Sequence, residues 1–377
     1  MNVTVGGRTR HYRTVAFEAR KNAIQLVDQR LLPHRFEIVR MPDFRETARA
    51  IKEMVVRGAG AIGATAAYGL AQGARAFRGC DLARFSRHVE KVQQALQAAR
   101  PTAVDPINAM IEVRRAMRAG GTIEEQQSLA LGAAEEFANN DVKQCEAIGR
   151  HGAPLIRDGM KILTHCNAGW LAFVDVGTAT APLYVAHAQG KRIHVFCDET
   201  RPRSQGATLT AWELAQQKIS HAIIADNAAG HLMQRGEIDL VIVGSDRALG
   251  RTGEVTNKIG TYTTAVLAER HRIPFYVALP FSTIDWKLSC GRDIPIEERD
   301  ESEVLGAWGL VSNPKSRIRN PKSQGRAYVR VGNPTSRARN PGFDVTPPEL
   351  ITGIITPGGI FKPSELWDHR GKLGYEE

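Results

Sequence analysis

The chain has 377 residues, of which 42% are hydrophobic, and its formal net charge at pH 7 is +10. At roughly 100–200 residues per domain, this length predicts two domains. No run of about 18 apolar residues occurs, which argues against a membrane-spanning helix. The first twelve residues are polar and basic and lack the apolar stretch of a secretory signal. The five cysteines and eleven histidines form no zinc motif, so we expect reduced thiols, a cytoplasmic location and no metal.

The first 150 residues predict a small antiparallel sheet followed by helices. Short strands are expected over residues 12–17, 23–28 and 35–41. Segments with helical spacing follow at 44–56, 64–77, 83–99, 106–119 and 123–146, and Asp43 is the expected N-cap of the first. We therefore predict an N-terminal β/helical domain over residues 1–150.

From residue 151 onward, short apolar segments alternate with helical ones. The expected strands are 161–165, 192–197, 222–224, 240–243 and 275–279, and the expected helices are 178–189, 209–216, 229–235 and 258–271. This alternation is typical of a parallel sheet with helices on both faces. The predicted fold class is α/β, with a Rossmann-like, doubly wound catalytic domain over residues 151–377.

The excess positive charge lies in residues 311–341, which hold eight Lys and Arg and no Asp or Glu, so the remaining chain carries +2 of the +10. Within this segment, Asn-Pro-Lys-Ser-Arg-Ile-Arg-Asn-Pro at 313–321 recurs as Asn-Pro-Thr-Ser-Arg-Ala-Arg-Asn-Pro at 333–341. Such a polar repeat buries little apolar surface, so we interpret it as a poorly ordered surface insertion outside the core. The alternative is an arm for RNA or a membrane, but Tyr328 is its only aromatic residue, which disfavours nucleic-acid binding.

Residues 57–63 read Arg-Gly-Ala-Gly-Ala-Ile-Gly and contain a formal Gly-x-Gly-x-x-Gly motif. A dinucleotide site requires a strand before this motif, whereas residues 46–56 have helical spacing, which disfavours NAD. Two interpretations stay open. The turn could open helix 64–77 and offer free N–H groups to an anion beside Arg57, or its glycines could allow close helix packing. Arg100 could be a ligand clamp or a solvated cation at a helix end.

Cys166 and Asp246 each follow a probable buried strand. In an open parallel sheet the carboxyl ends of the strands line the ligand crevice, so the two side chains could form an acid/base site. An apolar setting would raise the pKa of Asp246 and make it a proton donor. The structural alternatives are an inert buried thiol and an ion pair between Asp246 and Arg247.

Three further expectations concern neighbouring polar residues. Cys197 competes with Cys166, but the adjacent acids Asp198 and Glu199 would disfavour its thiolate. We expect these two acids to orient Arg201 and Arg203 instead. Residues 257 and 258 are expected to open a helix and, with residues 205–207, to supply polar contacts. No Gly-x-Ser-x-Gly motif supports acyl transfer.

Taken in order, these motifs resemble the methylthioribose-1-phosphate isomerase family, which shares a superfamily with the regulatory subunits of translation initiation factor 2B. The resemblance runs from about residue 27 to 356. It rests on residues 57–59, 100–102, 164–167, 198–202, 205–207, 243–247, 257–262 and 343–356. It implies an aldose–ketose isomerase of methionine salvage that converts 5-methylthioribose 1-phosphate to 5-methylthioribulose 1-phosphate. It also implies a homodimer without metal or organic cofactor.

By residue, the resemblance implies that Cys166 and Asp246 are catalytic. It implies that the substrate and its phosphate are bound by Arg57, Gly58, Ala59, Arg100, Gln205, Asn257 and Lys258. The sequence departs from the family pattern at 104–108, and Trp170 and Phe173 stand where smaller residues are common. Both departures concern the nonphosphate end of the sugar.

Three alternative functions remain. The enzyme could isomerise another pentose phosphate, 5-deoxyribose 1-phosphate or ribose 1,5-bisphosphate. A noncatalytic regulatory subunit is disfavoured, because a binding module needs neither Cys166 nor Asp246. The third alternative is RNA binding through residues 311–341.

Overall fold

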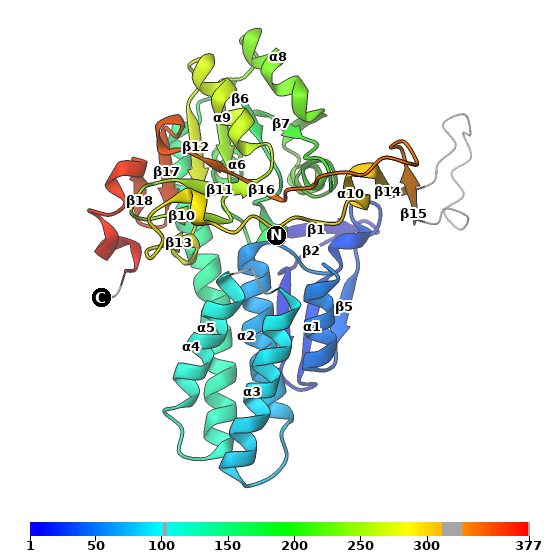
Figure 1. The fold of residues 1–377 in the computed structure, drawn as a ribbon, viewed down its shortest axis with the longest axis vertical. Coiled ribbons are helices and arrows are strands. Elements are labelled where there is room, and N and C mark those ends of the chain that lie inside the picture. Colours follow the sequence, from blue (N-terminus) through cyan, green and yellow to red (C-terminus); the bar gives the residue numbers. More distant parts are fainter. Residues whose placement is uncertain (101–103, 311–325, 376–377) are drawn as a thin grey trace.

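The computed structural model describes residues 1–100, 104–310 and 326–375 (Figure 1). Two antiparallel sheets open the chain. They are the hairpin of β1 (Asn2–Val5) and β2 (Arg8–His11), and the sheet of β3 (Val15–Glu18), β4 (Ala23–Val27) and β5 (Ile38–Met41). The three-stranded sheet confirms the prediction. The hairpin was missed, because the exposed β2 shows no apolar alternation.

Five helices follow and lie side by side in the lower half of Figure 1. They are α1 (Phe44–Lys52), α2 (Ala59–Ala76), α3 (Leu82–Ala99), α4 (Val104–Met117) and α5 (Ile123–Gly152). Asp43 caps α1 as predicted, by accepting hydrogen bonds from the N–H groups of Arg45 and Glu46. In α2, 15 of 18 residues are buried, because its small side chains let α3, α4 and α5 pack closely around it. The domain boundary at residue 150 stays a prediction, and α5 runs through it.

A seven-stranded sheet forms the upper half of the molecule. Its order is β18-β17-β12-β9-β6-β7-β8, and every neighbouring pair is parallel except β17 and β18. The strands are β6 (Lys161–Thr164), β7 (His194–Asp198), β8 (Ser220–Ile224), β9 (Leu240–Val243), β12 (Phe275–Ala278), β17 (Gly353–Thr356) and β18 (Gly359–Phe361). After β6 the chain adds β7 and β8 on one side of the sheet, and after β9 it adds β12, β17 and β18 on the other side. The strand order therefore reverses between β6 and β9.

Both faces of this sheet are covered by helices, which confirms the doubly wound α/β prediction. Because side chains alternate along a strand, Leu163 and Val241 pack on one face against α8 (Ala229–Gln234) and α9 (Thr261–Arg270). Ile162 and Leu240 pack on the other face against α5, α6 (Ala181–Ala188) and α7 (Ala211–Gln216).

A second, four-stranded sheet was not predicted. Its order is β13-β10-β11-β16, formed by β10 (Arg247–Leu249), β11 (Val255–Lys258), β13 (Ile284–Asp285) and β16 (Phe343–Thr346). The expectation that residues 257 and 258 open a helix is wrong. They end β11, which pairs with β16 from about 85 residues later, and α9 begins only at Thr261. A long-range pairing therefore overrides the local helical spacing.

The structure describes part of the basic insertion. Before it come α10 (Ser302–Leu305) and β14 (Gly306–Leu310), and β14 pairs with β15 (Arg326–Arg330) inside the insertion. Residues 311–325, with the first repeat copy, lie outside the described residues. The second copy is anchored, because Arg337 pairs with Glu301 and the buried Asn340 donates to the carbonyl oxygen of Asp300 at 2.8 Å. These contacts contradict the expected poor order for this copy, whereas most of its residues are exposed, as expected of a segment outside the core.

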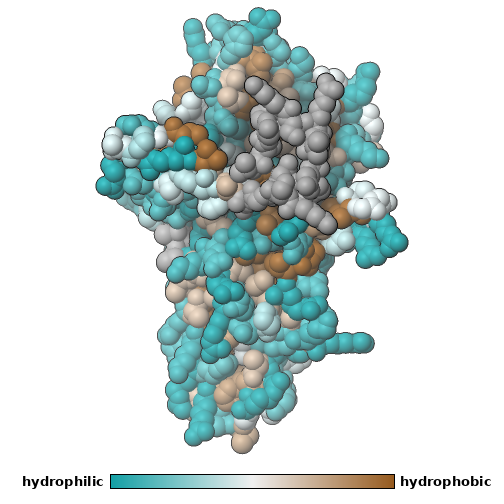
Figure 2. Space-filling model, turned by 90° about the vertical axis from the view of Figure 1, so that its right-hand side faces the viewer, coloured by the Kyte–Doolittle hydropathy of each residue, from teal (hydrophilic) through white to brown (hydrophobic). Residues whose placement is uncertain are grey.

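On the face seen in Figure 2, the helical half is mostly hydrophilic, and a patch of hydrophobic residues lies at mid-height. In the part of the chain that the structure describes, no helix combines the length and apolar character that a membrane crossing requires.

We predict that Gly60→Ala destabilises the protein, because a Cβ at Gly60 would lie 2.3 Å from Oδ1 of Asp141 and 2.5 Å from the Phe173 ring. Overpacking of this kind costs about 1–3 kcal/mol. In Gly132→Ala the new Cβ meets nothing within 4 Å on the exposed face of α5, so this control should gain about 0.5–1 kcal/mol. Urea midpoints measure both changes, and a Gly60→Ala midpoint at or above wild type would contradict the packing.

Candidate active site

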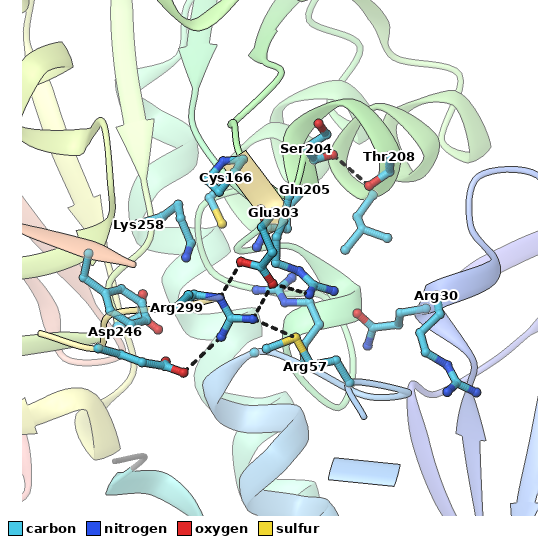
Figure 3. A pocket seen from close by; sticks show the side chains of 18 of the residues that line it. Arg30, Arg57, Cys166, Ser204, Gln205, Thr208, Asp246, Lys258, Arg299 and Glu303 are labelled. Carbon is cyan, nitrogen blue, oxygen red and sulfur yellow. Dashed lines mark hydrogen bonds and ion pairs between the residues drawn. The ribbon is translucent and has the colours of Figure 1, made fainter. Parts of the chain in front are cut away.

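A cavity of about 360 Å³ lies where the segments after β6 and β9 meet the start of α2. Eight of the nine predicted site residues line it: Arg57, Gly58, Ala59, Arg100, Cys166, Gln205, Asp246 and Lys258. Figure 3 shows Cys166, Lys258 and Arg57 around the same space, with Asp246 beside it. Residues brought from distant parts of the sequence thus share one cavity.

Cys166 is held by its backbone at the end of β6. Its φ is +63°, a left-handed conformation that is uncommon for a residue with a side chain. The N–H group donates to Oγ1 of Thr200 at 2.8 Å, and the carbonyl accepts from Oγ1 of Thr210 at 2.7 Å. These two threonines stabilise the unusual turn and fix the position of the thiol.

The charges around Cys166 act on its thiol in opposite directions. Burial raises the pKa of the Cys166 thiol above its ordinary value, and the positive charges of Arg57 and Lys258 oppose this rise. The net direction is upward, so the neutral thiol predominates near pH 7.

Asp246 follows β9, and its N–H group donates to the carbonyl of Thr256 at 2.9 Å. Its side chain is accessible from the cavity, and protein atoms surround it on the other sides. This enclosure raises the pKa of Asp246, although Lys258, Arg57 and Arg100 lower it in part. The structural alternative for Asp246 is wrong, because Arg247 pairs with Asp285 at 3.1 Å instead.

Two cations of the cavity wall are held by neutral oxygens. Arg57 donates to Oδ1 of Asn167 at 2.6 Å and to its carbonyl oxygen at 3.0 Å. Nζ of Lys258 donates to the carbonyl of Gly342 at 2.8 Å and lies 4.5 Å from the ring centre of Phe343. Among the described residues neither cation forms an ion pair with a carboxylate, so both can attract an anionic ligand, although burial lowers the pKa of Lys258.

The start of α2 adds backbone donors beside Arg57. The helix begins at Ala59, five residues before the predicted start, and its N-cap Gly58 provides no side-chain hydrogen bond. Gly58 has a φ of +92°, and a Cβ there would lie 2.4 Å from Cα of Ala172. Both interpretations of the glycine motif are therefore compatible: Gly60 lies in a close packing contact, and the first turn of α2 faces the cavity.

Gln205 and Asn257 differ in their access to the cavity. Gln205 is buried, and its Oε1 has no hydrogen-bond partner among the described residues, so a ligand hydroxyl could donate to it. Asn257 does not line the cavity. Its Nδ2 donates to Oγ1 of Thr261 at 3.0 Å and thereby connects β11 to α9.

A charged cluster in the wall was missed by the sequence reasoning. Arg299 pairs with Glu303 at 2.6 Å and with Glu297 at 3.0 Å, and Glu297 lies 3.8 Å from Arg100. Figure 3 shows Arg299 and Glu303 beside Arg57. The sequence around Arg299 is rich in charged residues, as solvated loops are, and it contains no motif that would identify Arg299 or its acidic partners as site residues. Of the motif at Arg100, Pro101 and Thr102 lie outside the described residues.

Asp105, in the segment that departs from the family pattern, also lines the cavity. Burial raises its pKa to about 6, and its Oδ1 has no partner among the described residues. The other departure, at Trp170 and Phe173, does not reach the cavity. Both side chains are buried and do not line it, so an effect on the nonphosphate end of the sugar would be indirect and stays a prediction.

The predicted pairing of Asp198 and Glu199 with Arg201 and Arg203 is also wrong. Asp198 contacts His165 at 2.9 Å. Arg201 donates to the carbonyl oxygens of residues 303, 304 and 306, and Arg203 pairs with Glu303. The two arginines therefore hold the segment before β14 over the cavity, where Trp308 and Tyr328 of the hairpin complete the wall.

Glu213 organises the loop that follows Cys166. This buried carboxylate accepts hydrogen bonds from the N–H groups of Trp170 and Leu171, from Nδ2 of Asn167 and from the hydroxyl of Tyr184. Since Asn167 in turn binds Arg57, Glu213 contributes to the position of the Arg57 guanidinium.

Among the described residues, one group of side chains has the spacing of a metal site: His165, Asp198 and Asp226, whose donor atoms lie within 4.8 Å of one another. Both ring nitrogens of His165 already have protein partners. Asp226 accepts backbone hydrogen bonds from Thr200 and Arg201 at 2.6 and 2.7 Å. The group is a hydrogen-bond network and does not line the cavity.

Comparisons with known proteins agree on one family. The sequence pattern of the initiation factor 2 subunit family matches residues 55–363. The chain is 48% identical to the methylthioribose-1-phosphate isomerase of Methylorubrum extorquens, over 94% of this chain and 95% of that protein. It is 46% identical to the protein of the same name from Chloroflexus aurantiacus, over 94% and 96%.

Solved structures give the same relationship. The 5-methylthioribose 1-phosphate isomerase of Pyrococcus horikoshii OT3 matches with a TM-score of 0.83 and 38% identity, covering 97% of this chain and 96% of that one. The translation initiation factor eIF-2B subunit delta from A. fulgidus matches with a TM-score of 0.80 and 38% identity, covering 97% and 100%. The resemblance drawn from the motifs is confirmed. The chain therefore belongs to the initiation factor 2 subunit family and, within it, to the methylthioribose-1-phosphate isomerases.

Proposed function

We propose that the protein converts 5-methylthioribose 1-phosphate to 5-methylthioribulose 1-phosphate, the aldose–ketose isomerisation of methionine salvage. The names and identities of its relatives support this reaction. The observation that supports it at the level of residues is the cavity, which the thiol of Cys166 and the carboxyl group of Asp246 line together with Arg57 and Lys258. Among the described residues, neither cation forms an ion pair with a carboxylate.

The substrate's phosphate is placed against the cationic wall. Arg57 offers a planar guanidinium that suits phosphate oxygens, and Lys258 adds a second positive charge. The free N–H groups in the first turn of α2, which begins with Gly58 as cap and Ala59, favour an anion at the same point. Arg100 and Gln205 are proposed to contact the sugar, because both line the cavity.

The chemistry requires proton transfer at the ring. The anomeric carbon C1 carries the phosphate, so the furanose cannot open spontaneously to an aldehyde. In the balanced reaction, the ring oxygen gains a proton as its bond to C1 breaks, a hydrogen moves from C2 to C1, and the C2 hydroxyl loses its proton as the ketone forms. This balance holds whether the hydrogen moves as a proton or as a hydride.

Asp246 is proposed as the acid that protonates the ring oxygen. Its carboxylate then takes a proton from the C2 hydroxyl. Its raised pKa keeps it protonated to higher pH than an ordinary carboxyl. Cys166, as a neutral thiol, is proposed to face C1 and C2 as partner acid/base or to stabilise the transition state.

Three expectations stay predictions. Asn257 does not line the cavity. We therefore propose that it contributes to substrate binding indirectly, through its hydrogen bond to Thr261. The homodimer and the cytoplasmic location follow from the resemblance and the composition.

We predict that 5-methylthioribose 1-phosphate gives a higher kcat/KM than 5-deoxyribose 1-phosphate or ribose 1,5-bisphosphate. Apolar residues such as Ile62, Val104 and Pro106 in the wall suit a thioether, whereas the carboxyl group of Asp105 disfavours a second phosphate. Phosphorus NMR can follow the three reactions. A higher value with either other sugar would reassign the substrate, and no turnover of any would favour a noncatalytic protein.

We predict that Asp246→Asn and Cys166→Ser each lower kcat by about 10²- to 10⁴-fold, the usual contribution of a positioned acid or base. Because the protonated form of Asp246 is active, wild-type kcat should fall as pH rises through its pKa, and this alkaline limb should be absent in Asp246→Asn. Steady-state kinetics over pH 5–10 measure both effects, with the exposed Cys80→Ser as control. Full activity in either variant would refute its assigned role.

We predict that Arg57→Ala raises KM at least about tenfold, since a charge-assisted hydrogen bond contributes roughly 1.5–3 kcal/mol. The control is Arg235→Ala, whose exposed guanidinium pairs with Glu237 and does not line the cavity. A KM that stays at the wild-type value in Arg57→Ala would remove this residue from the phosphate site.

A further inference from the structure

His165, which lies between the end of β6 and Cys166, connects three parts of the site. Its Nδ1 is 2.9 Å from Oδ2 of Asp198 at the end of β7, and its Nε2 is 2.8 Å from the carbonyl oxygen of Ile259. The side chain is 2% exposed and does not line the cavity. Neither the mechanism above nor the resemblance assigns it a role.

The two partners determine where the protons of this ring are. A carbonyl oxygen can only accept, so Nε2 must carry a hydrogen. Nδ1 faces a carboxylate oxygen, and this contact is favourable only if one proton lies between Nδ1 and Oδ2. The pair therefore forms a bridge with fixed donors, whichever of the two atoms holds the shared proton.

The charges that face His165 support a retained proton. Burial alone would lower the pKa of His165, but the hydrogen bond and charge of Asp198 raise it overall, and Asp226 acts in the same direction. Asp344 on β16 also faces the ring. All three of these neighbours are acidic, so their charges favour a proton on the His165–Asp198 pair.

The bridge holds the turn that follows Lys258. Ile259 is the next residue, and Gly260 closes on the ring with a φ of +104°, where a Cβ would lie 2.9 Å from Cε1 of His165. On its other side, the turn is held by Asp344, which accepts hydrogen bonds from the N–H groups of Gly260 and Tyr262 at 2.7 and 3.1 Å. Lys258 is thus fixed at both its side chain and its following turn.

We propose that His165 is a positioning residue which, through its bridge from Asp198 to Ile259, holds the ammonium group of Lys258 beside the thiol of Cys166. One hydrogen-bonded ring then sets the relative positions of β6, β7 and β11. The proposal rests on the proposed function for its effect on turnover, but its effect on the thiol can be measured without any substrate.

The thiol reports the position of Lys258. Its pKa is raised by burial and by Asp246, and it is lowered by Arg57 and Lys258. If the turn after Lys258 loosens, the ammonium moves away and the pKa of Cys166 rises. Alkylation by iodoacetamide, followed at the Cys166 peptide by mass spectrometry, gives the pH midpoint of the thiol separately from the other four cysteines.

We predict that His165→Phe, which keeps a ring but no donors, raises the alkylation midpoint of Cys166 by at least about half a pH unit. It should also lower kcat by about 10- to 100-fold with KM changed less than about threefold, as a small misplacement near the reacting atoms does. His165→Gln can still donate to Ile259 and should recover part of both values. Asp198→Asn can donate to Nδ1 and should stay close to wild type.

The control is His194→Phe on β7, whose ring contacts Ser220 rather than the site. If His165→Phe does not fold, His165→Gln gives the same test with a smaller shift. An unchanged midpoint in the histidine variants, or a loss of kcat without any shift in midpoint, would overturn the proposal. If the wild-type protein turns over no sugar, the proposed function fails while the alkylation midpoints still decide the role of His165.

Discussion

The pairing of β6 with β9 is the constraint on which the site depends. The two strands lie side by side in the middle of the seven-stranded sheet, with Ile162 opposite Leu240, and the strand order reverses between them. At such a point the connections leave in opposite directions, and a crevice opens beyond the carboxyl ends of the strands. Cys166 and Asp246 are the residues that follow these two ends. A register set by buried apolar side chains thus brings two reactive groups together.

The charges of the cavity wall leave a positive electrostatic potential near Cys166. The cavity wall holds many charges, but most of its arginines are paired with acids, as Arg299 is with Glu303. Arg57 and Lys258 contact neutral oxygens instead, so an unbalanced positive field remains near the thiol. Enclosure by protein strengthens this field and also raises the pKa of Asp246. The same burial therefore favours an anionic phosphate and an acid catalyst.

Much of this site could be predicted from sequence, because motifs at strand ends are local. Cys166 and Asp246 follow apolar strands whose pattern is clear, and the parallel sheet explains why they meet. The β11–β16 pairing could not be predicted, since it joins segments about 85 residues apart and turns an expected helix start at Lys258 into a strand end. The acidic partners of Arg299 were missed for a similar reason. Their role depends on tertiary contacts, and the sequence around them resembles an exposed loop.

The most direct measurement is a crystal structure of the protein with 5-methylthioribose 1-phosphate or its product bound. The account predicts the phosphate between Arg57, Lys258 and the first turn of α2, with C1 and C2 between the sulfur of Cys166 and the carboxyl group of Asp246. A sugar phosphate bound outside this cavity, or one whose C1 and C2 lie beyond the reach of both groups, would contradict it.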